Sequence, residues 1–118
     1  MPIKSVLTEK SLGILMHPSC IPGGIICGTF GNGAKKWIKM LHKHGIDYWQ
    51  FLPLTPPDST GSPYSSPSSF AINPWFLDVD DLIDKGFIFI ANKEELGTTN
   101  KNKNYFDFDF ADNLTKKL

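Results

Sequence analysis

Short apolar runs separated by turn-forming residues open the chain. Residues 12–16 (LGILM) are continuously apolar and are bounded by Ser11 and by His17-Pro18. A run this short, with proline so close to it, favours a fully buried strand over a helix. The following segment, 18–33, is rich in glycine and proline, so we expect it to be a loop.

An amphipathic helix is expected next, with Asn32 as its N-cap and Gly45 at its end. Apolar residues recur there at helical spacing, while the lysines face outward; the apolar set is Ala34, Trp37, Ile38 and Leu41. Residues 48–54 (YWQFLPL) form a nearly unbroken apolar run, typical of a strand covered on both faces. Strand, helix and strand together predict a βαβ unit in an α/β fold.

The second half of the chain is more polar. Residues 55–69 are dominated by Pro, Ser, Thr, Gly and Asp and predict a surface loop, and residues 75–86 predict an extended piece leading into a helical turn. Residues 92–104 are polar and of low complexity, so we expect them to be mobile. From residue 105 Phe and Asp alternate, which predicts a strand with Phe106, Phe108 and Phe110 on one face before the pattern becomes helical.

Composition and charge narrow the class of partner. The 118 residues fit one modest domain, and 12 basic residues balance 12 acidic ones. No basic surface for a nucleic-acid backbone is therefore predicted. The N-terminal residues lack the apolar region of a secretory signal, and no stretch approaches the roughly 18 apolar residues of a membrane span. We expect a cytoplasmic protein without nucleic-acid or membrane partners.

Residues that commonly carry chemistry do not form a recognisable site. The candidate zinc ligands are His17, Cys20, Cys27, His42 and His44. The cysteines are too far apart for the usual zinc pairs and the two helical histidines point to different sides, so we predict buried thiols and no metal site. Asp107 and Asp109 would share one strand face, as a glycosidase pair would, but any strand with one solvated face has this pattern. We predict no catalytic residue.

The loop around Tyr64 leaves two interpretations open. Tyr64 offers an apolar ring face surrounded by the hydroxyl groups of Ser62, Ser65 and Ser66. This combination suits a sugar ring, which has an apolar face and hydroxyl edges. A polar turn with an incidental tyrosine accounts for the same residues.

Several segments, taken in order, resemble the beginning of the amylomaltase family, also called 4-alpha-glucanotransferase or disproportionating enzyme. They are LGILMHPSCIPG, YWQFLPLTPP, GSPYSSPSSFAINPWFLDVDDLI and FDFAD. The resemblance runs from about Leu12 to the end of the chain. It implies the N-terminal part of a (β/α)8 TIM barrel, incomplete here, within residues 1–118. Residues 12–16 and 48–54 would be its first two strands, and 55–74 its active-site loop.

The same resemblance implies a function. The family transfers α-1,4-glucan segments between maltooligosaccharides by a retaining mechanism, with no metal or organic cofactor. Ser62 and Tyr64 match family positions that contact the glucan. The family's catalytic aspartate and glutamate lie beyond Leu118, so we expect a truncated chain that is inactive alone: a gene fragment, a truncated product, or one piece of a split enzyme with a complementing C-terminal fragment. The alternative is a small stand-alone carbohydrate-binding or protein-interaction module.

Overall fold

The computed structural model describes residues 10–89 and 107–117. The segment 92–104, which the sequence predicts to be mobile, lies outside these residues. Within the described ranges, no helix has both the length and the apolar content needed to cross a membrane. The cytoplasmic location expected from the sequence stays a prediction.

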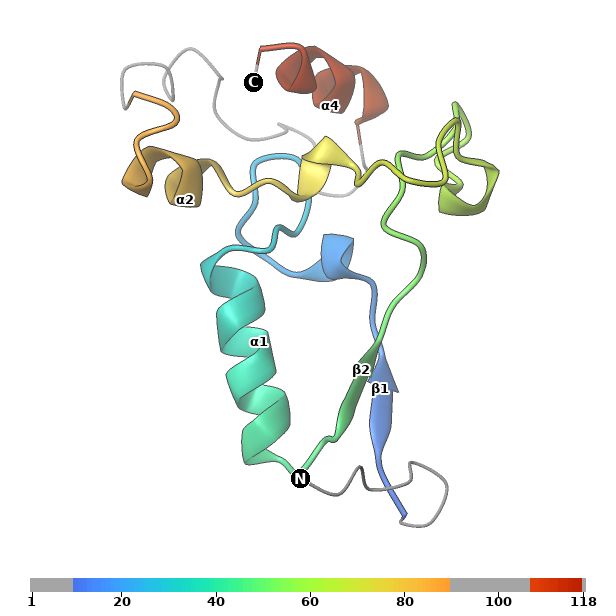
Figure 1. The fold of residues 1–118 in the computed structure, drawn as a ribbon, viewed down its shortest axis with the longest axis vertical. Coiled ribbons are helices and arrows are strands. Elements are labelled where there is room, and N and C mark those ends of the chain that lie inside the picture. Colours follow the sequence, from blue (N-terminus) through green and yellow to red (C-terminus); the bar gives the residue numbers. More distant parts are fainter. Residues whose placement is uncertain (1–9, 90–106, 118) are drawn as a thin grey trace.

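Two parallel strands and the helix between them form the βαβ unit that the sequence predicts (Figure 1). Strand β1 spans Gly13–Leu15 and strand β2 spans Tyr48–Gln50, with Ile14 opposite Trp49 at the centre of the register. The indole Nε1 of Trp49 donates a hydrogen bond of 2.7 Å to the carbonyl of Met16, just beyond β1. The carboxyl ends of both strands point toward the same end of the molecule.

Helix α1, Asn32–Lys43, connects the two strands. Its N-cap is Gly31, so the prediction of Asn32 as the N-cap is wrong by one residue. The carboxylate of Asp78 lies so close to Gly31 that a Cβ there would overlap it, which leaves room only for glycine where the chain enters the helix. The end of the helix is as predicted, because Gly45 follows it with a φ of +68°.

Both strands are more exposed than the sequence predicts. All three residues of β1 are exposed, with Leu15 at 61%, and Tyr48 of β2 is 47% exposed. Parallel strands become buried when neighbouring strands flank them and helices cover both faces. The described residues supply one crossover helix and two strands. The prediction of strands buried on both faces is therefore wrong for this part of the chain.

A second group of short helices lies beyond the carboxyl ends of the strands. The single 3-10 turn η3, Pro74–Phe76, leads into helix α2, Val79–Asp84. The side chain of Asp78 caps α2 by accepting a hydrogen bond of 3.0 Å from the backbone of Asp81. It also accepts one of 2.5 Å from the hydroxyl of Thr29, which ties the loop before α1 to the start of α2. The helical turn predicted in this region is confirmed.

Helix α4 spans Phe108–Thr115, so the strand predicted from the alternating Phe and Asp residues is wrong where it can be compared. The side chain of Asp107 accepts a hydrogen bond of 2.9 Å from the backbone of Phe110, which is the ordinary N-cap interaction. Ala111 and Leu114, three positions apart, are both buried. The period of the buried residues is therefore helical, and the alternation has no structural role.

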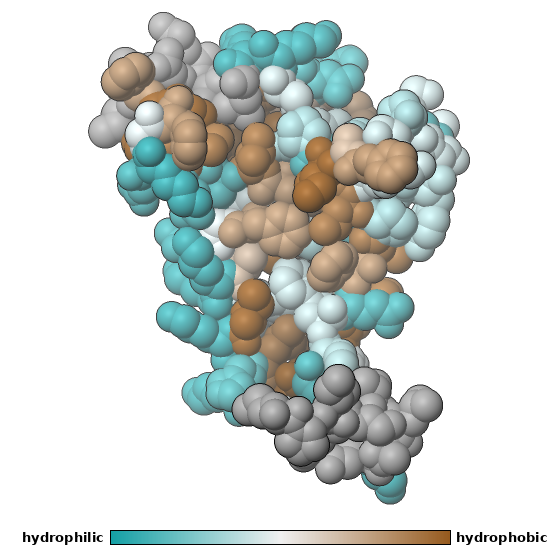
Figure 2. Space-filling model, in the orientation of Figure 1, coloured by the Kyte–Doolittle hydropathy of each residue, from teal (hydrophilic) through white to brown (hydrophobic). Residues whose placement is uncertain are grey.

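A buried apolar cluster joins α2 to α4. Its buried members are Val79 and Leu114, against which Ile25, Ile26, Ile83 and Phe110 pack. Exposed hydrophobic side chains also gather over the middle of one face, and hydrophilic side chains of α1 and α2 border this hydrophobic area (Figure 2). The buried cluster thus lies at the carboxyl ends of the strands, while along the strands Trp37 of α1 packs edge-on against Trp49 of β2, with ring centroids 6.3 Å apart, and β1 stays exposed.

Candidate functional site

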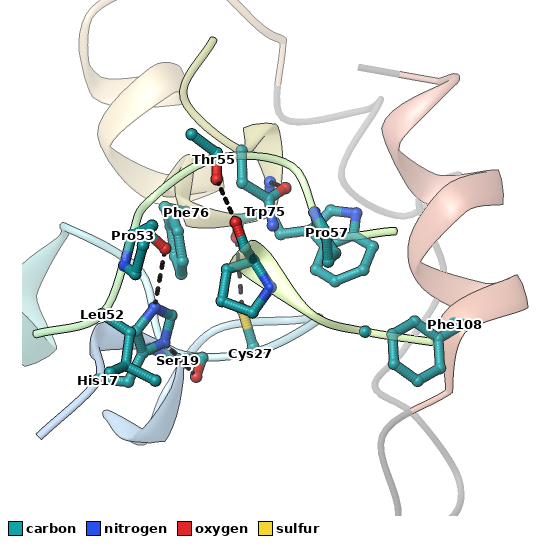
Figure 3. A pocket seen from close by; sticks show the side chains of 13 residues that line it. His17, Ser19, Cys27, Leu52, Pro53, Thr55, Pro57, Trp75, Phe76 and Phe108 are labelled. Carbon is teal, nitrogen blue, oxygen red and sulfur yellow. Dashed lines mark hydrogen bonds between the residues drawn. The ribbon is translucent and has the colours of Figure 1, made fainter. Parts of the chain in front are cut away.

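A cavity of about 340 Å³ opens beyond the carboxyl ends of β1 and β2 (Figure 3). Its lining comes from the turn after β1, the chain after β2, η3 and the start of α4. The lining residues are His17, Ser19, Cys27, Leu52, Pro53, Thr55, Pro57, Gly61, Pro63, Asn73, Trp75, Phe76 and Phe108. In α/β folds, ligands bind outside the carboxyl ends of parallel strands, so this cavity is the candidate site.

His17 joins the segments that follow the two strands. Its Nδ1 accepts a hydrogen bond from the backbone of Ser19 at 3.4 Å and lies 2.8 Å from the hydroxyl of the same residue. Because Nδ1 accepts from an N–H group, the ring hydrogen is on Nε2, which lies 3.5 Å from the carbonyl of Pro53. The ring also packs against Phe76, with centroids 5.5 Å apart. His17 therefore helps to shape the cavity wall.

Phe108 closes the cavity from a distant part of the sequence. Its ring lies 5.9 Å from that of Trp75, centroid to centroid. It also covers Gly61, where a Cβ would meet the Phe108 ring at 2.5 Å and where φ is +84°. Gly61 is therefore required both for its backbone conformation and for this contact. The contact fixes the start of α4 against the loop that follows β2.

Hydrogen bonds hold the loop after β2 in a defined shape. Asp58 Oδ1 accepts from the backbone of Thr60 at 2.8 Å, from its hydroxyl at 2.6 Å and from the backbone of Ser62 at 3.0 Å. These bonds, led by that of the Thr60 hydroxyl, lower the pKa of Asp58. Their stabilisation is therefore present above the ordinary carboxyl pKa and is lost as the pH falls through the lowered value. Nearby, the hydroxyl of Thr55 donates to the carbonyl of Pro63 at 2.8 Å.

The two residues that the sequence singles out, Ser62 and Tyr64, lie beside the cavity and do not line it. Ser62 sits between the lining residues Gly61 and Pro63 and is the N-cap of the 3-10 turn η2, Pro63–Ser65. Tyr64 is 71% exposed. Its ring is therefore largely open to solvent, in the turn that begins with the lining residue Pro63.

The active-site loop expected over residues 55–74 includes several lining residues, but the parts of the cavity wall outside that loop were not identified from the sequence. From the sequence, His17 is considered only as a possible zinc ligand, and Phe108 is placed in a strand. The contact between Phe108 and Gly61 joins residues far apart in the chain, so no local pattern could have indicated it.

Cys27 lines the cavity as a protonated thiol. Burial, and to a smaller extent the nearby Cys20, raises the pKa of Cys27 to about 11. Its Sγ lies 3.4 Å from the carbonyl oxygen of Gly28 and 3.8 Å from that of Trp75, either of which can accept the S–H hydrogen. Because thiolate is the reactive form, Cys27 is not an activated nucleophile at neutral pH. Cys20 is exposed.

The described cavity wall carries one imidazole and one thiol, those of His17 and Cys27, and no carboxylate. The described ranges contain no group of three or more His, Cys, Asp or Glu that could hold a metal ion. Aromatic rings and prolines give the wall apolar faces, and Ser19, Thr55 and Asn73 add polar groups. Apolar faces with a few fixed polar groups are typical of a small-molecule site.

A family model described as 4-alpha-glucanotransferase matches residues 16–118. The chain belongs to this family. Its 4-alpha-glucanotransferase relatives include the proteins from Clostridium butyricum, 44% identical over 80 residues, and Thermus thermophilus, 38% identical over 79 residues. These alignments cover 68% and 67% of this chain. A chloroplastic/amyloplastic 4-alpha-glucanotransferase from Arabidopsis thaliana is 33% identical over 96 residues, or 81% of this chain.

A solved structure agrees with the family assignment. The amylomaltase from Streptococcus agalactiae in complex with acarbose superposes with a TM-score of 0.78 at 28% identity, and the match covers 92% of this chain and 23% of that one. The alignments with the three 4-alpha-glucanotransferase relatives each cover 16% of the relative. This chain therefore spans a small part of the length of the proteins that it matches.

Proposed function

We propose that this chain forms the start of a 4-alpha-glucanotransferase (β/α)8 barrel and contributes part of its glucan site. Residues 12–16 and 48–54 would be the first two barrel strands, and 55–74 the active-site loop. The observation that carries this proposal is the cavity beyond the carboxyl ends of parallel β1 and β2. In (β/α)8 enzymes the active site is built from the loops at that end of the strands.

Ser62 and Tyr64 are proposed to contact α-1,4-glucans and maltooligosaccharides. The exposed ring of Tyr64 offers a flat apolar face for a sugar ring, and Ser62 offers a hydroxyl group beside the cavity. The amylomaltase structure to which this chain is similar holds acarbose. A related oligosaccharide is therefore a reasonable first ligand to test.

The bond-breaking groups are proposed to come from polypeptide outside this chain. A retaining transfer needs two carboxyl groups about 5 Å apart, one as nucleophile and one as general acid and base. The described cavity wall carries neither. The exposed strands β1 and β2 are suited to receive the neighbouring strands of the barrel, since an open parallel edge and bare apolar faces favour such pairing.

The test is disproportionation of maltotriose, followed by the appearance of glucose and longer maltooligosaccharides. We expect no transfer by the 118-residue chain alone, because loss of a nucleophile removes the covalent route. We expect transfer when it is mixed with the Thermus thermophilus relative from which the corresponding N-terminal segment has been removed. That deleted relative alone is the control and should be inactive.

Two results would contradict the proposal. Transfer by the chain alone would mean that it contains the catalytic groups. A mixture in which the two polypeptides associate and bind maltotriose without transfer would instead favour a separate carbohydrate-binding module.

A further inference from the structure

The tip of the loop between β2 and η2 is organised around a single side chain. Asp58 Oδ1 receives three hydrogen bonds, two from Thr60 and one from Ser62. The backbone is closed in the same place, because the N–H of Asp58 donates to the carbonyl of Ser62 at 3.1 Å and the N–H of Gly61 donates to the carbonyl of Asp58 at 3.0 Å. The Asp58 side chain and these backbone bonds together set the path of the chain into Ser62.

The base of the same loop is held separately. The hydroxyl of Thr55 donates to the carbonyl of Pro63, and the N–H of Asn73 donates to the carbonyl of Leu54 at 2.8 Å. These two bonds fix the ends of the loop, whereas the side-chain bonds of Asp58 act at its tip. Removing the carboxylate would thus loosen the tip without detaching the loop from the fold.

The tip leads directly into the residues that the proposed function assigns to the sugar. Ser62 ends the hydrogen-bonded turn, and Tyr64 lies two residues further on, in η2. A binding loop that is already ordered loses less conformational entropy when the ligand arrives. The hydrogen bonds around Asp58 order the chain that leads to Ser62 and Tyr64, so these two residues lose less conformational entropy when a sugar binds.

We propose that Asp58 is a positioning residue for the glucan site, which holds Ser62 and Tyr64 in their binding geometry and does not itself contact the sugar. This inference rests on the proposed function. The oxygen of Asp58 that faces the loop is fully used by donors from Thr60 and Ser62. A side chain of the same shape with an uncharged acceptor oxygen should therefore keep these hydrogen bonds in place of the Asp58 carboxylate.

The test compares Asp58→Ala with Asp58→Asn in a titration of the chain with maltoheptaose. Asp58→Ala should weaken binding about tenfold, the loss expected when hydrogen bonds to a charged group no longer order a binding loop. Asp58→Asn keeps an acceptor oxygen and should stay within about threefold of the unmodified chain. Asp84→Ala removes the same charge from an exposed position in α2 and should leave the affinity unchanged.

Each other result has a definite meaning. Asp58→Ala binding as well as the unmodified chain would overturn the inference, and so would Asp58→Asn binding as weakly as Asp58→Ala, since the charge itself would then act on the sugar. No binding by the unmodified chain would refute the proposed function and this inference with it. Binding that is lost in Tyr64→Ala and retained in Asp58→Ala would leave the proposed function intact and reject the inference alone.

A graft keeps the test decisive if Asp58→Ala does not fold. The Thermus thermophilus relative would carry residues 55–64 of this chain in place of its own corresponding segment. In that enzyme, Asp58→Ala should raise the KM for maltotriose about tenfold, and Asp58→Asn should restore it to within about threefold. A KM that both variants leave unchanged would overturn the inference.

Discussion

Gly28→Ala is expected to destabilise the protein by about 3 kcal/mol, the upper range for forcing extra atoms into a packed site. A Cβ at Gly28 would overlap the carbonyl of Pro18 and would lie 2.6 Å from both the backbone nitrogen and the carbonyl oxygen of Ile21. These are backbone atoms, so no side-chain rotation can relieve the overlap. The N–H of Gly28 also donates to the carbonyl of Ser19 at 2.9 Å, and the substitution would strain this bond.

Thermal or urea unfolding followed by circular dichroism measures this loss, which corresponds to a melting temperature lower by roughly 10 °C. Gly45→Ala is the matched control. Its φ of +68° is unfavourable for alanine, yet nothing lies within 4 Å of the added Cβ. We expect Gly45→Ala to lower the free energy of unfolding by about 1 kcal/mol, which is the cost of the left-handed backbone conformation alone. Equal losses in the two variants would contradict the close packing at Gly28.

Tyr64→Ala is expected to weaken maltoheptaose binding about 30-fold. Contact between the exposed ring and a sugar face removes on the order of 80 Å² of apolar surface from water. Burial of this area contributes about 2 kcal/mol to the binding free energy. That free energy corresponds to about 30-fold in affinity. Isothermal titration calorimetry measures the change. Tyr64→Phe keeps the ring and should stay within about threefold, because only the hydroxyl is lost.

Phe87→Ala is the matched control for Tyr64→Ala. Phe87 is 75% exposed, much like Tyr64 at 71%, but it follows α2 and lies outside the loop. We expect its removal to leave the affinity unchanged. A similar loss in both variants would mean that any exposed aromatic ring attracts the sugar, and the specific role of Tyr64 would be rejected.

The βαβ unit could be predicted because its signals are local. Residues 12–16 and 48–54 are short apolar runs bounded by proline, and Gly45 marks the end of the helix between them. The start of α1 was missed because the residue there is chosen by a contact with Asp78, which is distant in sequence. Tertiary contacts of this kind do not appear in a local pattern.

The alternating Phe and Asp residues led to the wrong prediction of a strand where helix α4 lies, for a different reason. Asp107 has a strong local preference as a helix cap, and Ala111 and Leu114 are buried at helical spacing. A period of two over a few residues cannot outweigh a capped helix that buries its apolar side. The same error concealed the cavity wall, because Phe108 reaches Gly61 only from the first turn of α4.

The most direct test of the central claim is a titration of the isotopically labelled chain with maltoheptaose, observed through its backbone amide and indole N–H resonances. We expect the largest shifts in the amides of residues 61, 62 and 64–66 and at the indole of Trp75, where the loop meets the cavity. Shifts confined to α1, or none at saturating sugar, would contradict a glucan site at the carboxyl ends of β1 and β2.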